Sequence, residues 1–264
     1  MIISKHWLNE WVDLSEVSGE TLSKTLNSIG LEVDSYKEIN LPKSVVVGYV
    51  KSREKHPDAD KLSVCQVDVG SETLQIVCGA KNVEAGQFVP VALIGTTMPN
   101  GLEIKKAKLR GIESCGMICS STELGLPKTN DGILPLDESI GKLKLGTSLG
   151  EFEAFKDVII EVDVTANRGD CQNLHGIARE ICTALDLNMK DSHENEDSEN
   201  LLGIGRIASV RTEDKVNGSF LYKAFELKNA LSENLLIRLR LALIDCQKTN
   251  LVERMLEYAT FCTG

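Results

Sequence analysis

The chain has 264 residues, of which 42% are hydrophobic and 26% are charged, and its formal net charge is −10. These values are ordinary for a globular protein and predict one to three domains with a sizeable core. The opening residues, MIISKHWLNEW, contain no long apolar run, which excludes a signal peptide or membrane span there and predicts a cytoplasmic protein with no membrane partner. Eight cysteines are scattered through apolar stretches, unlike the dense spacing of a secreted disulfide framework.

Charge is distributed unevenly along the chain. Residues 1–42 have three Lys/Arg against seven Asp/Glu, a net charge of −4, and residues 129–264 have fifteen against twenty-three, a net charge of −8. Residues 43–128, between them, have eleven against nine, a net charge of +2. This middle segment is therefore the part of the chain whose charge favours binding to a polyanion.

Residues 1–40 predict two helices followed by a strand. Ser4 suits the N-cap of a short helix, whose apolar face consists of Trp7, Leu8 and Trp11. A second helix is predicted from about Gly19 to a stop at Gly30, with an apolar face of Leu22, Leu26 and Ile29. An extended segment, Leu31–Tyr36, follows. This short segment has too little apolar surface to bury two tryptophans, so we expect it to pack with a partner from elsewhere in the chain.

A group of four cations stands in the stretch KKAKLRGIESCGMICS, residues 105–120. Alternation along an extended strand places Lys106 and Lys108 on one face, with Arg110 next in line. Such spacing suits a row of phosphates better than a single carboxylate. The alternative is a solvated strand whose lysines protect a sheet edge. The RNA-binding residues predicted from this stretch are Lys105, Lys106, Lys108 and Arg110.

The segments around this stretch carry a resemblance to a known domain. VVVGYV, HPDADKL, LQIVCGAKNV and KLRGIESCGMICSSTELGL occur in this order between about Lys43 and Leu126. Together they resemble the tRNA-binding OB-fold domain of aminoacyl-tRNA synthetases and of free-standing tRNA-binding proteins. The resemblance implies an OB-type barrel over residues 41–150 and tRNA as a partner.

A partner for the N-terminal segment follows the OB-like region. Val158–Val164 alternates as a strand, and a helix is predicted from about Asn173 to Leu187. The apolar face of that helix consists of Leu174, Ile177, Ala178, Ile181 and Leu185. We infer a discontinuous α/β domain in which residues 1–40 pack with residues 151–190, and in which the OB-fold is an insertion.

The segment TANRGDCQNLHGIARE resembles the T-P-N-R-x-D…G-[IL]-A-R-E signature of the bacterial phenylalanyl-tRNA synthetase β-subunit family. Ala166 replaces the usual proline, which loosens the turn and leaves the rest of the pattern intact. With this segment the resemblance spans the whole chain as the N-terminal portion of such a subunit. It implies an α+β multidomain fold, a contribution to the attachment of phenylalanine to its tRNA, and an (αβ)2 heterotetramer formed with the α subunit. ATP and Mg²⁺ are implied for the whole enzyme.

The remaining residues divide into a linker and the start of another domain. Residues 191–200, DSHENEDSEN, have no apolar side chain and predict an acidic linker or loop. By resemblance, residues 201–264 begin an α+β editing-type domain. Strands are predicted at Gly203–Val210 and Phe220–Leu227, and helices around Glu233–Cys246 and Leu251–Phe261.

The resemblance to the family is weaker over residues 201–264. Ser232 suits the N-cap of the first of its helices. The segment KTNL, residues 248–251, stands near the family's N-N-V-V-D stretch, and Asn250 is the residue that it preserves. We assign no catalytic role to any residue there. The editing pocket is implied to be incomplete, so we expect this chain alone neither to aminoacylate nor to edit.

Candidate catalytic and metal-binding residues are few. Cys115 and Cys119 form a C-x3-C pair without a second ligand pair, which favours buried apolar cysteines over a zinc site. Cys171 and His175 lie four residues apart, and packing explains such a pair better than metal binding. His56 precedes a proline in a turn, where a turn-forming role is favoured over a general base. No nucleotide-binding glycine motif is present, so we predict no catalytic, cofactor-binding or metal-binding residue in this chain.

Three classes of function fit these observations: a ligase subunit that binds tRNA, a free-standing tRNA-binding module, and an architectural protein whose OB-fold binds protein. The TANRGDCQNLHGIARE segment favours the first over the second, because a free-standing module has no need of a split domain around it. The architectural alternative stays open, since OB-folds have many ligands and a net charge of +2 is modest.

Overall fold

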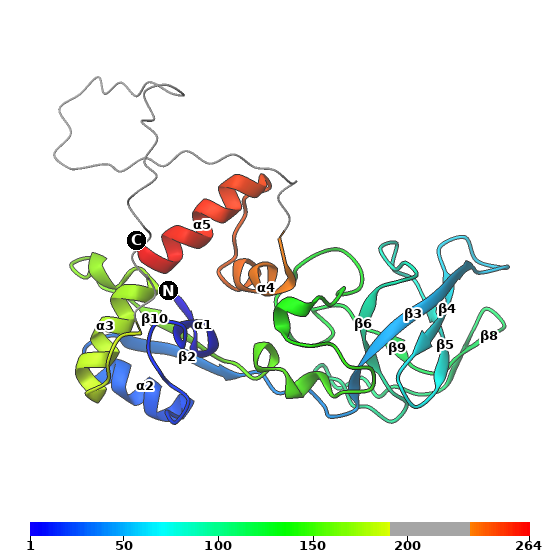
Figure 1. Ribbon diagram of the computed structural model, residues 1–264, viewed down its shortest axis with the longest axis horizontal. Helices are drawn as coiled ribbons and strands as arrows, with labels where there is room; N and C mark the ends of the chain where they lie inside the picture. The colour runs from blue at the N-terminus through cyan, green and yellow to red at the C-terminus, as the bar shows by residue number, and fades with distance from the viewer. Residues whose placement is uncertain (191–232) are drawn as a thin grey trace, which may run out of the picture. The chain divides into compact units, whose positions relative to one another are not determined.

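The computed structural model of the protein describes residues 1–190 and 233–264 (Figure 1). Several features predicted from the sequence lie outside these residues: the acidic segment 191–200, the strands at 203–210 and 220–227, and the cap at Ser232. No helix within the described residues combines the length and hydropathy that a membrane span requires.

Strands from the two ends of the predicted split domain form one sheet. β1 (Ile2–Ser4), β10 (Val158–Asp163) and β2 (Glu32–Glu38) pair antiparallel in the order β1-β10-β2. β10 is the central strand, with Ile160 opposite both Ile3 and Tyr36. The strands expected at 31–36 and 158–164 are thereby confirmed to within two residues at each end.

Helices α1 (Lys5–Leu8), α2 (Gly19–Ser28) and α3 (Leu174–Leu185) accompany this sheet (Figure 1). The Ser4 side chain accepts a 2.9 Å hydrogen bond from the backbone N–H of Trp7, which confirms its capping role. Gly30 adopts a φ of +83°, and the chain leaves α2 there. Trp7, Trp11 and the apolar face of α3 belong to one buried cluster, so the first segment does pack with residues beyond 150.

A second partner covers Trp7 from the C-terminal part of the chain. The helices there are α4 (Leu235–Leu243) and α5 (Leu251–Thr263). The indole of Trp7 stacks on the rings of Tyr258 and Phe261, with centroids 4.8 and 5.0 Å apart. Asn234 caps α4 by accepting a 2.9 Å hydrogen bond from the N–H of Ile237. The helices expected around 233–246 and 251–261 are confirmed, whereas their packing against Trp7 was not anticipated.

Residues 45–118 form a nearly closed barrel of five strands, as expected for an OB-fold. The strands are β3 (Val45–Lys55), β4 (Ser63–Asp68), β5 (Thr73–Cys78), β6 (Phe88–Ala92) and β9 (Met117–Ile118). Their order is β5-β4-β3-β6-β9, and β5 also contacts β9, which brings the two edges of the sheet together. The long strand β3 pairs with β6 along its first half and with β4 along its second half. A register shift between Val50 and Ser52 accompanies this change of partner.

Both faces of the first half of β3 are buried, which explains the uninterrupted VVV sequence of this strand. Val46 and Val50 pack with Cys65, Ile76 and Val89 in one cluster. Val45 and Val47 pack on the opposite side, in a second cluster that contains Leu134, Leu149, Phe155 and also Leu235 and Leu239 from α4. Short 3₁₀ helices lie in the connections between these elements, at Glu138–Ile140, Leu149–Glu151, Glu153–Phe155 and Gly169–Cys171.

Candidate nucleic-acid interface

The cationic stretch predicted to bind RNA forms a β-hairpin beside β5 (Figure 1). Its strands are β7 (Ala107–Leu109) and β8 (Ile112–Ser114), joined by the dipeptide Arg110-Gly111. Arg110 has a φ of +47° and Gly111 a φ of +90°, the left-handed conformations that a tight two-residue hairpin turn requires. The expectation that Arg110 continues the row of Lys106 and Lys108 is therefore wrong, because the strand ends at Leu109 and Arg110 occupies the turn.

The lysines of the hairpin are divided between its two sides. Lys105 and Leu109 line a cleft beneath the hairpin, and by alternation Lys106 and Lys108 belong to the other side. On that other side Lys108 stands opposite Glu113 in the strand register, and Lys106 Nζ lies 2.9 Å from a Glu113 carboxylate oxygen. The four cations thus do not form a single stripe: Lys105 lies on one side, Lys106 and Lys108 on the other, and Arg110 in the turn.

Carboxylates partly neutralise this surface. Glu113 pairs with Lys106, and Glu103 lies 2.8 Å from Lys105 Nζ. The hydrogen bond from Lys106 lowers the pKa of Glu113, with a further contribution from the charge of Lys108. All these side chains are at least half exposed, so water screens the pairs and each contributes little to stability. Within the described residues Lys108 and Arg110 form no salt bridge, which leaves their charges available to a phosphate.

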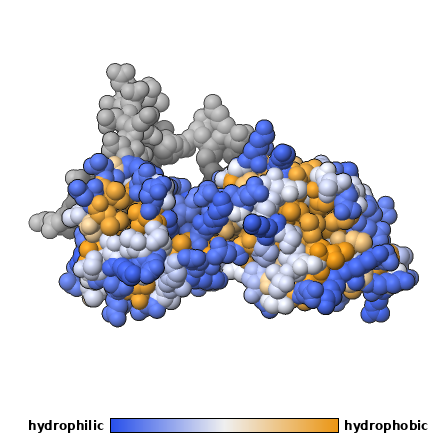
Figure 2. Space-filling view, turned by 90° about the horizontal axis from the view of Figure 1, so that it is seen from below, coloured by the Kyte–Doolittle hydropathy of each residue, from blue (hydrophilic) through white to orange (hydrophobic). Residues whose placement is uncertain are grey.

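The cleft beneath the hairpin has a volume of about 690 Å³. Its walls include apolar side chains such as Leu109 and Met117, the hydroxyl of Ser114, and Lys105 and Lys128. Lys128 is bound to Asp131 at 2.6 Å. The face of the molecule in Figure 2 likewise shows apolar residues among hydrophilic ones over the part of the chain that forms the barrel. Three carboxylates, those of Glu103, Glu123 and Asp131, also line this cleft. The lysines at its edge, rather than aromatic stacking platforms, are therefore what it offers to a nucleic acid.

A second cationic groove, of about 370 Å³, was not predicted from the sequence. Its cations come from three segments and are Arg53, Lys55, Lys61 and Lys81. Asp60 is the acidic residue of its wall, and it pairs with Lys55 at 2.7 Å. Period-two spacing of Arg53 and Lys55 in β3 is the one local signal that could have indicated it. His56, for which a turn-forming role was expected, is buried next to this groove and bonds to the β7–β8 hairpin.

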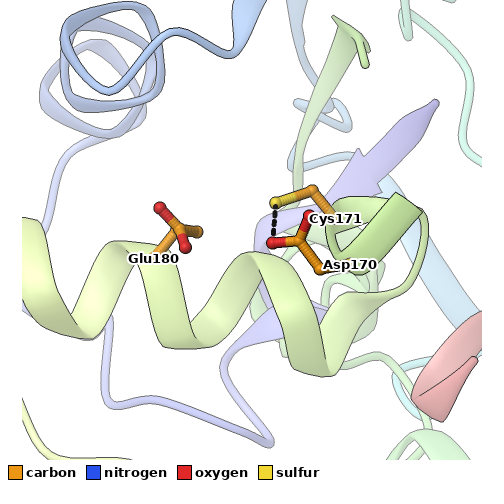
Figure 3. Close-up of side chains that lie close together, drawn as sticks. All are labelled: Asp170, Cys171 and Glu180. Atoms are coloured by element: carbon orange, nitrogen blue, oxygen red, sulfur yellow. Dashed lines mark hydrogen bonds between the residues drawn. The ribbon is translucent and has the colours of Figure 1, made fainter. Parts of the chain in front are cut away.

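Two groups of side chains around Cys171 have structural explanations, one found in the structure and the other, with His175, noted in the sequence. Asp170, Cys171 and Glu180 bring their ligand atoms within 4.8 Å of one another (Figure 3). The guanidinium of Arg168 bonds to both oxygens of Asp170, at 3.0 and 2.9 Å, and reaches Glu180 at 3.0 Å and Cys171 Sγ at 2.8 Å. The guanidinium of Arg168 therefore already pairs with both carboxylates of this group. His175 packs edge-on against Trp11, away from a shared site with Cys171, at a centroid distance of 5.1 Å.

The cysteines behave as packing residues. All eight are free thiols. In the C-x3-C pair, Cys119 is fully buried, and burial raises the pKa of its thiol to about 12, while Cys115 is only half-buried. Burial likewise raises the pKa of Cys65 to about 11. Thiols held protonated in this way are poor nucleophiles and poor metal ligands.

Comparisons with known proteins find a tRNA-binding match in the part of the chain that contains the hairpin. Residues 45–144 match the family model described as "Putative tRNA binding domain". The whole chain is 57% identical to the phenylalanine–tRNA ligase β subunit of Campylobacter jejuni strain RM1221 and covers 34% of its length. Over its whole length the chain is similar to phenylalanine–tRNA ligase β subunits. The corresponding subunits of Wolinella succinogenes and Sulfurimonas denitrificans are 53% and 49% identical over the whole chain, which again covers 34% of each.

The chain thus spans about a third of the length of these β subunits. Two solved structures align with parts of it: the C-terminal domain of Plasmodium vivax p43, with 31% identity over 29% of this chain and 46% of that one, and a MetRS related protein from Pyrococcus horikoshii, with 27% identity over 40% and 87%. Their TM-scores are 0.24 and 0.29. The segment that matches the tRNA-binding family model contains the hairpin, the cleft and the second cationic groove.

Proposed function

We propose that this chain supplies a tRNA-binding surface to a phenylalanine–tRNA ligase. The supporting observation is the β7–β8 hairpin, which carries exposed cations and lies over a cleft inside the segment that matches tRNA-binding domains. The residues assigned to RNA contact are Lys105, Lys106, Lys108 and Arg110. Lys108 and Arg110 form no salt bridge in the described part of the chain, so we expect them to contribute more than Lys105 and Lys106.

The name of the relatives also supports a proposal about the partners and cofactors of the whole enzyme. In a phenylalanine–tRNA ligase, the β subunit acts together with an α subunit in an (αβ)2 heterotetramer that uses ATP and Mg²⁺ in the cytoplasm. This chain contributes RNA binding and architecture to that assembly, and it holds no nucleotide loop of its own. Residues 1–40 with 151–190 form the domain that carries the OB-fold of residues 41–150, and residues 201–264 begin an editing-type domain.

The alternative of a free-standing tRNA-binding module is disfavoured by the full-length similarity to β subunits. A free-standing OB-fold would account for residues 45–144. It would leave the TANRGD…GIARE segment without a role. The two functions also differ in partners, because only the ligase subunit requires an α subunit.

A salt titration of tRNA binding tests the proposal. Four phosphate contacts give a slope of roughly −3 in a plot of log K against log salt concentration, taking the single-strand value per contact. The triple variant Lys106→Ala, Lys108→Ala, Arg110→Ala should lose most binding to any tRNA sequence, because phosphate contacts carry no sequence information. Equal retention of tRNA by the variant and the unaltered chain at low salt would reject this surface.

A further inference from the structure

His56 lies in the loop between β3 and β4, yet its side chain is almost fully buried, at 2% exposure. The backbone N–H of Asp58 donates a 3.1 Å hydrogen bond to Nδ1. Nε2 lies 3.1 Å from the carbonyl oxygen of Leu109, a residue 53 positions later in the chain. Because a carbonyl oxygen only accepts and a backbone N–H only donates, Nε2 carries the proton and the ring is neutral.

The imidazole therefore joins two segments that both bear exposed cations. The first, here called the loop arm, comprises residues 53–62 and contributes Arg53, Lys55 and Lys61 to the second groove. The other, the hairpin arm, comprises residues 105–114, and Leu109 stands between Lys108 and Arg110 at its tip. The backbone of the loop arm is itself closed by a 3.1 Å hydrogen bond from His56 N–H to Leu62 O.

The hairpin arm has firm anchors at its base and few at its tip. At the base, Gln75 Nε2 donates to Glu113 O and Cys115 N–H donates to Gln75 O, each at 2.8 Å. The Ser114 hydroxyl accepts from Val77 N–H at 3.1 Å. β7 itself is exposed along its length, and among the described residues the bond from His56 is the one hydrogen bond that reaches it from outside the hairpin. A two-stranded hairpin is marginal without such support.

We propose that His56 is a positioning residue for RNA binding, which fixes the hairpin arm against the loop arm so that the cations of both contact one RNA backbone. This inference rests on the proposed tRNA-binding function. Cations held in place before binding lose less conformational entropy when the RNA arrives. Since the ring is neutral, a neutral substitution leaves the charge of the surface unchanged, and any loss of affinity then reports on geometry.

The test compares four variants of the chain: His56→Ala, His56→Asn, His56→Gln and, as a matched control outside the interface, His6→Ala. Binding of an unmodified phenylalanine tRNA transcript is measured by fluorescence anisotropy over a series of salt concentrations. His56→Ala removes both bonds to the ring. The Asn side chain can keep the bond from Asp58 N–H but is too short for Leu109 O, whereas the Gln amide nitrogen can reach that oxygen.

We expect His56→Ala and His56→Asn to weaken binding roughly tenfold and to reduce the magnitude of the salt slope by about 1.4, the equivalent of two phosphate contacts. His56→Gln should recover most of the affinity and slope, and His6→Ala should match the unaltered chain. Hydrogen exchange of the amides at 109–112 should accelerate in the Ala and Asn variants, while the amides of β3 and β4 keep their protection.

The outcomes separate the two proposals. If the unaltered chain binds tRNA and the Ala variant shows the same affinity and slope, the inference about His56 is wrong and the RNA-binding function stands. If the unaltered chain binds no tRNA even at low salt, the proposed function fails, and the role of His56 in it fails as well. Should His56→Ala not fold, the contrast between Gln and Asn decides, because equal binding by these two variants contradicts a bond to Leu109 as the cause.

Discussion

The guanidinium of Arg240 donates a 2.6 Å hydrogen bond to the carboxylate of Glu10, a residue 230 positions earlier in the chain. Arg240 also donates to the hydroxyl of Tyr258 at 2.6 Å and lies over the Trp7 ring, 5.1 Å from its centroid. It is only 5% exposed. One buried cation thereby connects α4 and α5 to the N-terminal segment, and the charge needs Glu10 as its partner because burial of an unpaired charge is costly.

Glu10→Gln should lower the free energy of unfolding of this core by about 1–2 kcal/mol, since Arg240 loses its counter-ion while Glu10 itself is half exposed. Arg240→Ala should cost more, about 3 kcal/mol, because the hydrogen bond to Tyr258 and the contact with Trp7 are lost too. Both tryptophans of the chain lie in this core, so their fluorescence during urea denaturation reports on it directly.

The matched control is Glu20→Gln. Glu20 pairs with Lys24 on the surface of α2, where both side chains are 75% exposed, so its substitution should leave the free energy of unfolding nearly unchanged. An effect of Glu10→Gln no larger than that of the control would show that α4 and α5 are held to the N-terminal segment by apolar packing alone.

Asp170 should make the stability of the same core depend on pH below about pH 4. The hydrogen bonds from Arg168 lower the pKa of Asp170 from 3.8 to about 2 in the folded protein. A depressed folded-state pKa stabilises the protein at every pH above the unfolded value, and this contribution is lost as pH falls from about 4 to about 2. Asp170→Asn should therefore be less stable than the unaltered chain at pH 7, with the difference shrinking below pH 4.

Urea midpoints measured between pH 7 and pH 2.5 provide this comparison. Asp163→Asn is the control, because Asp163 is an exposed carboxylate at the end of β10 that forms no salt bridge within the described residues. If the urea midpoints of Asp170→Asn and the unaltered chain differ by the same amount at every pH, the prediction is wrong. Protonation of Asp170 would then not change the stability that its pair with Arg168 provides.

Local signals predicted much of this fold, because the interactions behind them are local. The Ser4 cap, the stop at Gly30 and the alternation of 158–164 each depend on a few neighbouring residues. Gly176, a residue of the family signature, is required by tertiary packing. A Cβ at this position would lie 1.7 Å from the carbonyl oxygen of Asp170. The sequence indicated that this glycine belonged to a signature, but only the packing of α3 on the preceding turn explains it.

Features that depend on distant residues were missed. The N-terminus of α4 is capped partly by Asp137, whose carboxylate accepts from Leu235 N–H at 2.7 Å across 98 residues. Arg110 was placed on a strand because Arg-Gly is a weaker turn signal than Asn-Gly or Asp-Gly. The second groove collects its cations from three separate segments. Tertiary proximity of this kind leaves no periodic pattern in the sequence.

The carboxylate of Glu113 should weaken RNA binding. Its carboxylate pairs with Lys106 at 2.9 Å and stands opposite Lys108 in the register of the hairpin. Glu113→Gln would release Lys106 and remove the negative charge opposite Lys108 while leaving the strand pairing intact. Both members of the lost ion pair are more than half exposed, so stability should hardly change. We expect tRNA affinity to rise roughly three- to fivefold and the salt slope to steepen by about 0.7, the value of one additional phosphate contact.

Glu32→Gln separates this local effect from net charge. Glu32 is exposed on β2, outside the tRNA-binding match, and its substitution changes the net charge of the chain by the same amount. Anisotropy titrations of both variants at several salt concentrations give the comparison. If Glu113→Gln and Glu32→Gln raise the affinity equally, long-range electrostatics explains the gain; a rise confined to Glu113→Gln, with the steeper slope, places Lys106 and Lys108 in contact with the RNA backbone.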